Sequence, residues 1–205
     1  MLPQTAPDRL HFILQRTHEE VFEPDSVADV PLVQFVAFAS NHRVFGWVHL
    51  RANRLTDLLN AHEELLLTEV EIESLEDGAT RSVDEVLIRC SELIAVHASG
   101  PRGNEARRRP TRTHAVAIQS GNYLIGGYLH ARPGSDPLAS VDERPRMVPL
   151  TDAWIEYWLD GERTKQSSGT IIVNRERVDW MRVVTDEDLF GGLLRPTPAP
   201  DRMAS

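Results

Sequence analysis

The chain contains two triplets of residues whose side chains could bind a ligand. Each triplet consists of an aromatic residue, a histidine and an arginine at alternate positions. They are Trp47, His49 and Arg51 in one place, and Tyr128, His130 and Arg132 in another. Residues two positions apart lie on the same face of a β-strand, so each triplet predicts a candidate binding face. Such a face could hold an anion, stack a base or form a pH-sensitive contact. The structural alternative, which we favour, is a half-exposed strand face whose histidines bond neighbouring carboxylates.

Other combinations of reactive side chains give only weak evidence for a metal site or a catalytic site in this sequence. His42, His49 and His62 lie near one another, but no cysteine or carboxylate accompanies them at metal-ligand spacing. The single cysteine, Cys90, lies in an apolar strand-like run without an evident catalytic partner, which favours a small buried thiol over a nucleophile. Phosphate-binding and hydrolase motifs are missing from the sequence. We therefore expect no enzyme activity, no metal and no cofactor.

The composition narrows the range of partners. The chain has 205 residues and a net charge of −9. This charge argues against general nucleic-acid affinity and indicates no DNA specificity, because phosphate binding needs clustered lysine and arginine. No apolar run is long enough to cross a membrane, and no secretory signal is evident. Since one cysteine excludes an internal disulfide framework, we expect a cytoplasmic protein with no membrane partner.

The two triplets belong to a longer internal repetition. Residues 44–51 resemble residues 125–132, and residues 67–73 resemble residues 150–156. The copies are offset by 81 residues at the histidines (49 and 130), by 83 at the threonines (68 and 151) and by 85 at the last matched pair (93 and 178). Small loop insertions between fixed elements explain the drift in the offset. The repetition predicts two copies of one structural unit.

The elements expected in each copy are short strands. Apolar and β-branched runs predict five strands per copy, the last two forming a pair at 85–89 with 93–97 and at 170–174 with 178–184. Residues 54–63 predict a short helical turn in the first copy only. Five short strands fit a small bent sheet or a partly open barrel. Residues 8–23 predict an N-terminal α-helix, which Asp8 can cap.

These elements predict a mainly β fold, with two tandem five-stranded small barrels or bent sheets and an N-terminal α-helix. The expected divisions are an N-terminal helix and lead-in (1–28), a first β repeat (29–100), an arginine-rich linker (101–112), a second β repeat (113–190) and a disordered tail (191–205).

The end of each copy resembles the last motif of the Sm-like family. In that family an apolar strand is followed by Arg/Asn-Gly and then by an isoleucine or valine, and residues 86–94 and 169–178 are similar. Cys90 and Arg175 stand where the family has glycine. The resemblance implies Sm-like barrels in both copies.

The same resemblance implies possible contacts with RNA. Asp57 and Asn60 are similar to the Asp and Asn of the family's first motif, and the family's RNA-contacting positions correspond to Asn60, Arg89 and Asn174. Residues 54–60, Arg-Leu-Thr-Asp-Leu-Leu-Asn, also resemble a motif in small bacterial proteins of unassigned function. That second resemblance implies a domain type and supplies no activity.

The sequence favours a non-catalytic interaction or assembly module that acts through protein partners or self-association, because open strand edges invite pairing. The first alternative is an Sm-like RNA-binding regulator that uses the linker arginines Arg107, Arg108 and Arg109 together with the residues above. The second alternative is a small-ligand sensor with a site between the repeats.

Overall fold

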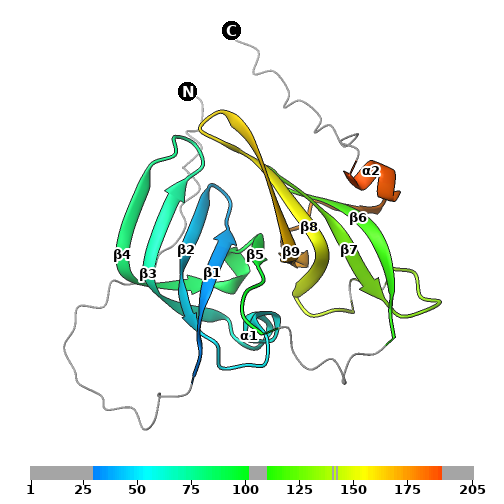
Figure 1. Ribbon diagram of the computed structural model, residues 1–205, viewed down its shortest axis with the longest axis horizontal. Helices are drawn as coiled ribbons and strands as arrows, with labels where there is room; N and C mark the ends of the chain where they lie inside the picture. The colour runs from blue at the N-terminus through cyan, green and yellow to red at the C-terminus, as the bar shows by residue number, and fades with distance from the viewer. Residues whose placement is uncertain (1–29, 102–109, 140, 142, 191–205) are drawn as a thin grey trace, which may run out of the picture.

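Antiparallel strands dominate the protein in the computed structural model, which describes residues 30–101, 110–139, 141 and 143–190 (Figure 1). The expected N-terminal helix, the expected disordered tail and residues 102–109 of the arginine-rich linker lie outside the described residues. The mainly β prediction is confirmed, since ten strands form one sheet. We refer to residues 30–101 as the first half and to residues 110–190 as the second half.

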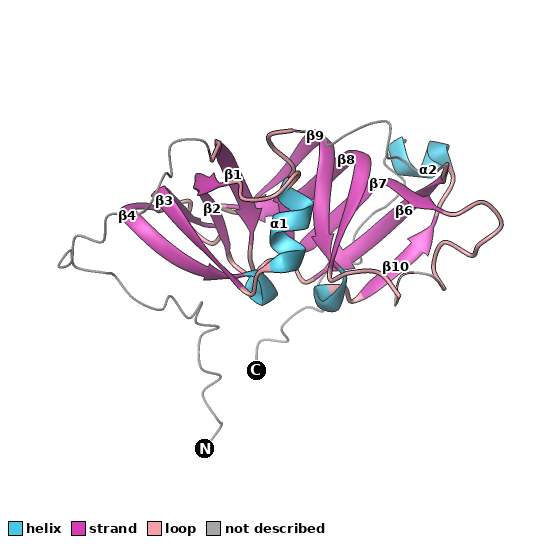
Figure 2. Cartoon of the chain, turned by 90° about the horizontal axis from the view of Figure 1, so that it is seen from below, coloured by secondary structure: helices cyan, strands magenta, loops and turns pink. Residues whose placement is uncertain are grey.

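Each half contributes five strands. Those of the first half are β1 (Leu32–Phe38), β2 (His42–His49), β3 (Glu64–Ser74), β4 (Thr80–Arg89) and β5 (Ala95–His97). Those of the second half are β6 (Arg112–Ser120), β7 (Tyr123–Ala131), β8 (Met147–Leu159), β9 (Glu162–Asn174) and β10 (Trp180–Val183). The short helices are α1 (Leu55–Ala61), the 3₁₀ turns η1 (Cys90–Glu92) and η3 (Arg175–Arg177), and α2 (Asp186–Phe190). Figure 2 shows α1 and α2 beside different parts of the sheet.

The ten strands lie in the order β10-β6-β7-β8-β9-β5-β1-β2-β3-β4, and every neighbouring pair is antiparallel. Both halves have the same internal order: the last strand, then the first, second, third and fourth. The halves meet where β9 pairs with β5, so they form one continuous open sheet. The finer prediction of two tandem Sm-like barrels stays a prediction.

The expected pairing of the last two strands in each copy is wrong. β4 pairs with β3, and β5 pairs with β1 and β9. Likewise β10 pairs with β6 instead of β9. The physical reason is the 3₁₀ turn between these strands, which carries the chain across to the opposite side of its own half instead of folding it back as a hairpin.

A bulge bends the third strand of each half at the same place. The bulged residues are Glu69 in β3 and Asp152 in β8, with positive φ angles of 50° and 47°. A glycine in the neighbouring strand faces each bulge, Gly46 in β2 and Gly127 in β7. A Cβ on Gly127 would lie 2.9 Å from the Cβ of Ala153, closer than side chains allow. The missing side chains let the strands approach, and the bulges curl the sheet around its core.

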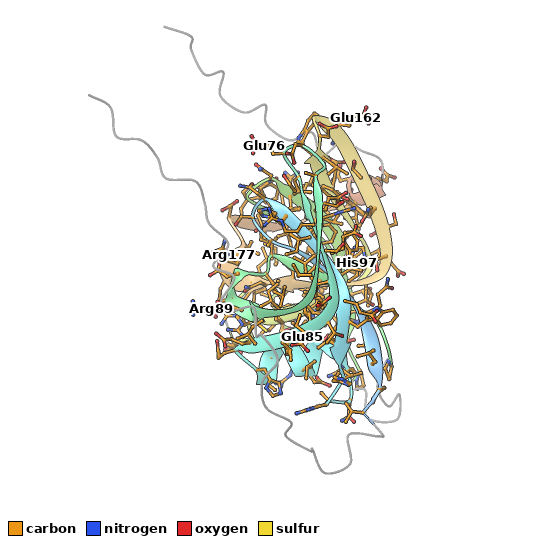
Figure 3. The ribbon with its side chains drawn as sticks, turned by 90° about the vertical axis from the view of Figure 1, so that its left-hand side faces the viewer. Glu76, Glu85, Arg89, His97, Glu162 and Arg177 are labelled. Carbon is orange, nitrogen blue, oxygen red and sulfur yellow. The ribbon has the colours of Figure 1, made fainter. Side chains whose placement is uncertain are left out.

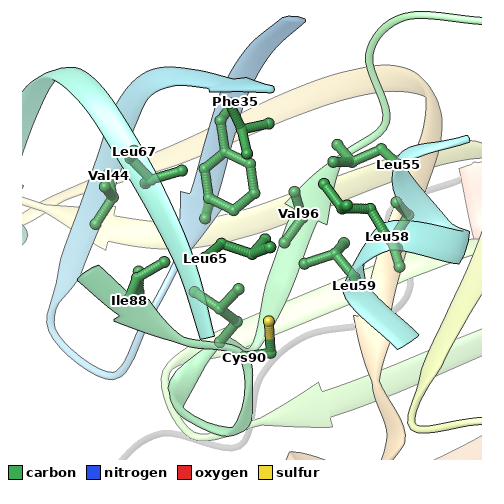
Figure 4. Packing of buried hydrophobic residues seen from close by; sticks show 14 of the residues in the cluster. Phe35, Val44, Leu55, Leu58, Leu59, Leu65, Leu67, Ile88, Cys90 and Val96 are labelled. Atoms are coloured by element: carbon green, nitrogen blue, oxygen red, sulfur yellow. The ribbon is translucent and has the colours of Figure 1, made fainter. Parts of the chain in front are cut away.

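The core has two main clusters, and each contains residues from both halves. The cluster in Figure 4 packs the inner face of the first half against three leucines of α1, namely Leu55, Leu58 and Leu59. The expected helical turn at residues 54–63 is thus present. Met147 and Ile172 of the second half join this cluster, while Phe38 of the first half joins the cluster of the second. The two halves therefore share one interior.

Candidate functional site

The contact between β5 and β9, which we call the internal junction, joins the strands of the two halves into one sheet. Three residue pairs face each other across it: Ala95 and Val173, Val96 and Ile172, His97 and Ile171. Two further backbone hydrogen bonds extend it, from Ala98 N to Thr170 O at 3.0 Å and from Asn174 N to Ile94 O at 2.9 Å. Val96 and Ile172 are both 0% exposed. The centre of the junction is therefore a buried apolar strand contact.

Side chains reinforce the internal junction on one side. The Tyr123 hydroxyl donates a hydrogen bond of 2.5 Å to the carbonyl of Ala39 in the other half. The Arg43 guanidinium donates to the Tyr157 hydroxyl, and its Nε lies 2.5 Å from the Glu73 carboxylate. The Tyr123–Ala39 and Arg43–Tyr157 hydrogen bonds both cross between the two halves. They fix the second half against the first.

An aromatic cluster lies beside these hydrogen bonds. The ring of Phe38 contacts His97, Tyr123 and Tyr157, with ring centroids 5.3, 5.7 and 5.4 Å apart. His97 Nε2 is buried and has no hydrogen-bond partner among the described residues. Burial lowers the pKa of His97, and the nearby positive charge of Arg43 lowers it further. His97 is therefore a neutral aromatic component of the junction at physiological pH.

On the α1 side, Asn60 holds the first residue of β8. Its amide donates to the carbonyl of Met147 at 2.9 Å and accepts from the Met147 N–H at 2.8 Å. Arg146 forms an ion pair of 3.1 Å with Glu63. These contacts dock the start of β8 onto α1 and the residues that follow it.

The two outer strands of the sheet, β4 and β10, hold the same positions in their halves as the two strands that meet at the internal junction. β4 is the fourth strand of its half, as β9 is, and β10 is the fifth strand of its half, as β5 is. Figure 3 shows the molecule from the β4 side, with Glu85 and Arg89 labelled on that strand. Within the described chain neither strand has a partner on its outer edge. We call them the open edges.

The open edges expose apolar side chains at positions that the internal junction buries. Leu87 in β4 occupies the place of Ile172, and Met181 in β10 occupies the place of Val96; both are partly exposed. Trp180 and Val183 in β10 are 42% and 46% exposed. Exposed apolar residues on an unpaired strand favour association with a further strand.

The two predicted triplets lie on separate parts of the sheet. Trp47 and His49 are exposed on β2, and Tyr128 and His130 are half-buried on β7. Four strands separate β2 from β7, so the structure does not bring the triplets together. Arg51 and Arg132 follow their strands and are also exposed. The triplets therefore do not form one binding face.

In the second half the triplet has structural contacts. The Tyr128 hydroxyl donates to Asp186 of α2 at 3.1 Å, and the His130 ring nitrogens lie 3.2 Å from Thr111 Oγ1 and 2.9 Å from Thr151 Oγ1. In the first half, by contrast, Trp47 at the position of Tyr128 is 36% exposed. The helix α2 packs on strands of the second half and does not cover Trp47 (Figure 1).

The residues proposed to contact RNA have other partners where the structure describes them. The Asn174 side chain is buried, donates to Leu93 O at 2.9 Å and accepts from Glu176 N at 3.1 Å. Asn60 binds the backbone of Met147, as described above. Arg89 lies on the open edge β4. Arg107, Arg108 and Arg109 are outside the described residues. The sequence indicated Asn60 and Asn174 as polar residues of interest, but it contained no signal that they hold the two halves together.

Arg89 itself forms an exposed ion pair, with its Nε 3.1 Å from the Glu64 carboxylate. Such surface pairs contribute little to stability. The position therefore remains accessible from solvent.

A polar pocket of roughly 480 Å³ lies where turns of the two halves approach each other. Its lining includes two asparagines from corresponding turns, Asn41 and Asn122, together with Arg177 of η3. The Arg177 guanidinium donates to Ser40 Oγ at 3.1 Å, which links the halves across the pocket. The pocket could accept a small polar molecule.

The described residues contain no cluster of histidine, cysteine, aspartate or glutamate that could hold a metal ion. Cys90 is buried, and burial raises the pKa of its thiol to about 11. Within the same residues, no helix has both the length and the apolar character needed to cross a membrane. Comparison of the chain with protein-family models, curated proteins and solved structures gave no match. Inference about function therefore rests on the geometry of the chain.

Proposed function

We propose that this protein is a non-catalytic assembly module that self-associates through its open edges, with β4 of one molecule pairing with β10 of another. The observation that carries the proposal is the internal junction. The chain already joins a fourth strand to a fifth strand in β9 and β5, and within the described residues one further strand of each kind, β4 and β10, has an outer edge without a partner.

The internal junction sets the expected register. β10 pairs with β6 at the positions at which β5 pairs with β1, so Trp180 corresponds to Ala95. β4 corresponds to β9 in the same way. Arg89 of β4 faces Glu64, the first residue of β3, and Asn174 of β9 faces Met147, the first residue of β8. The pairs expected between molecules are Trp180 with Ile88, Met181 with Leu87, and Arg182 with Val86.

The expected contact buries apolar surface that is now partly exposed. Met181 opposite Leu87 would repeat the buried pair of Val96 and Ile172. Complete burial of one such side chain contributes roughly 1.5–3 kcal/mol, and the pairing also satisfies the unpaired backbone groups of both edges. Since each molecule has one edge of each kind, the contact is head-to-tail. Repetition of a head-to-tail contact gives a closed ring or a filament.

We also propose that each half is an Sm-like unit. Three features support this: five antiparallel strands, the shared order in the sheet, and the 3₁₀ turn between the fourth and fifth strands. The bend at Glu69 and Asp152 adds the curvature that a small barrel needs.

Two edge variants test the proposal. Leu87→Lys places a charge on the β4 edge, and Met181→Lys places one on the β10 edge. In sedimentation velocity over a range of concentrations, we expect the wild type to form oligomers and each variant alone to stay monomeric. Trp158→Ser is the matched control, because Trp158 is 52% exposed but lies on β8, away from both edges.

Mixing the two edge variants tests the head-to-tail geometry. Leu87→Lys retains the β10 edge and Met181→Lys retains the β4 edge, so an equimolar mixture should stop at dimers. Symmetric pairing of β4 with β4 would instead let Met181→Lys dimerise alone. A wild type that stays monomeric at every concentration would refute the proposed function.

A second candidate function, a small-ligand sensor, is favoured by the polar pocket between the halves. A ligand that binds only the folded protein raises its stability by RT ln(1 + [L]/Kd). Thermal denaturation with a panel of small polar compounds would detect such a ligand. The shift should disappear in Arg177→Ala, since Arg177 is the basic side chain of the lining. A panel without any stabilising compound would count against this candidate.

A further inference from the structure

Arg182 and Asp84 carry opposite charges on the two open edges of the sheet. Arg182 lies in β10 and Asp84 lies in β4, and both residues are exposed. Within the described part of the chain, neither side chain forms an ion pair or a hydrogen bond. The Arg182 guanidinium lies over the ring of Trp180, 5.6 Å from its centroid. Both charges are therefore available on the surfaces that the proposed self-association brings together.

The expected register places these two charges beside each other. Arg182 faces Val86 of the next molecule in that register, and Asp84 precedes Val86 by two residues in β4. Residues two positions apart in a strand share a face, so Asp84 is a diagonal neighbour of Arg182. Diagonal neighbours across a strand pair lie roughly 7–8 Å apart, which is within the reach of a long side chain such as arginine.

The internal junction has no such pair of charges at the corresponding positions. His97 corresponds to Arg182, and Gly169 corresponds to Asp84. Burial and the charge of Arg43 lower the pKa of His97, so its ring is neutral at physiological pH, and Gly169 has no side chain. The expected contact between molecules thus differs from the internal junction in having one positive and one negative group.

We propose that the Arg182 guanidinium of one molecule forms an ion pair with the Asp84 carboxylate of the next, and that this pair selects β4 as the partner of β10. The proposal rests on the self-association proposed above and assigns its specificity to two residues. The partner it fits is a second copy of this chain.

The pair discriminates against other combinations of strands. Association of two β10 edges brings together only positive side chains, and like charges across a strand pair are unfavourable. An arginine that meets β9 in place of β4 finds Gly169 there and no carboxylate. Charge pairs of this exposed kind contribute more to the choice of partner than to affinity.

A charge on an open edge can also act alone, because it discourages any further strand from pairing there. The two roles predict opposite effects of Arg182→Ala. If Arg182 forms the ion pair, removal of its charge weakens self-association. If Arg182 only protects the edge, the same substitution strengthens self-association.

The test measures self-association by sedimentation equilibrium at low salt. Arg182→Glu and Asp84→Arg each place like charges at the contact, so each should raise the dissociation constant about three- to tenfold. The double variant restores opposite charges and should associate within about twofold of the wild type. Glu162→Arg is the control, since it makes the same change of charge at an exposed residue of β9 outside the expected contact.

An equimolar mixture of the two reversed variants gives an independent readout. Every contact between unlike molecules in that mixture again joins opposite charges, whereas every contact between like molecules joins equal charges. Association should therefore return on mixing, and the oligomers should contain the two variants in equal amounts. Rescue in the double variant and in the mixture cannot arise from misfolding.

The edge variant Leu87→Lys separates failure of this proposal from failure of self-association itself. If Leu87→Lys abolishes oligomers while the double variant associates as weakly as the single ones, the ion pair is refuted and the assembly proposal stands. Tighter association of Arg182→Ala than of the wild type would also overturn the ion pair. If the wild type is monomeric throughout, both proposals are overturned.

Discussion

Glu69 and Asp152 adopt the same left-handed backbone conformation at the same bulge in the two halves of the sheet. Each follows a threonine, Thr68 or Thr151, and faces a glycine in the neighbouring strand. Non-glycine residues rarely adopt positive φ, and aspartate tolerates it better than β-branched residues do. The repeated Thr-Glu and Thr-Asp steps in the sequence therefore mark the point at which each third strand must bend.

The first prediction concerns this bend. Asp152→Val should lower the free energy of unfolding by about 1–2 kcal/mol, because a β-branched residue fits the left-handed region poorly. Asp152→Gly should be neutral or slightly stabilising, since glycine adopts positive φ without strain. Urea denaturation measures both. Equal destabilisation by the two substitutions would show that the carboxylate, and not the backbone angle, matters at this position.

The second prediction concerns Asn174 and its counterpart Arg89. Asn174→Ala should destabilise the protein by about 2 kcal/mol or more, because it leaves the buried Leu93 carbonyl and the Glu176 N–H without partners. Arg89→Ala, the matched control, removes only an exposed ion pair and should change stability by less than about 1 kcal/mol. Similar effects of the two substitutions would contradict a special role for Asn174 at the internal junction.

The third prediction concerns the reactivity of Cys90. With a thiol pKa of about 11 and a buried sulfur, almost no thiolate forms at pH 8. A thiol reagent such as DTNB should therefore react very slowly with the native protein and rapidly in urea. Stopped-flow absorbance measures both rates. Fast reaction of the native protein would show that this part of the core opens readily.

The fourth prediction is a loss of stability in mild acid through His97. Burial, followed by the charge of Arg43, lowers its folded pKa below the ordinary value of 6.5. The unfolded chain then binds a proton more readily than the folded protein does, so the stabilising contribution is complete above pH 6.5. It is lost progressively as the pH falls from 6.5 towards the folded pKa.

His97→Gln should show a flatter pH dependence of stability between pH 7 and 5 than the wild type, since glutamine does not titrate. Urea titrations at several pH values provide the measurement. His62→Gln serves as the control, because His62 is exposed. An unchanged slope in His97→Gln would assign the acid sensitivity to other groups, His42 among them.

The sequence by itself determined the local structure of the protein. Apolar and β-branched runs predicted the strands, because such a run is visible in a few neighbouring residues. Leu55, Leu58 and Leu59 predicted the short helix by the same argument. The apolar run around Cys90 predicted a buried thiol. Each of these features depends on residues close together in the chain.

Tertiary structure alone decided which distant strands meet. No local pattern pairs β5 with β9, because strand pairing depends on which edges remain open after the hairpins form and on how the bulges bend the sheet. The same long-range choice separated Trp47 from Tyr128 by four strands and turned Asn60 and Asn174 towards the other half. A side chain's partner across such a contact lies more than 80 residues away, where short-range sequence patterns carry no information about it.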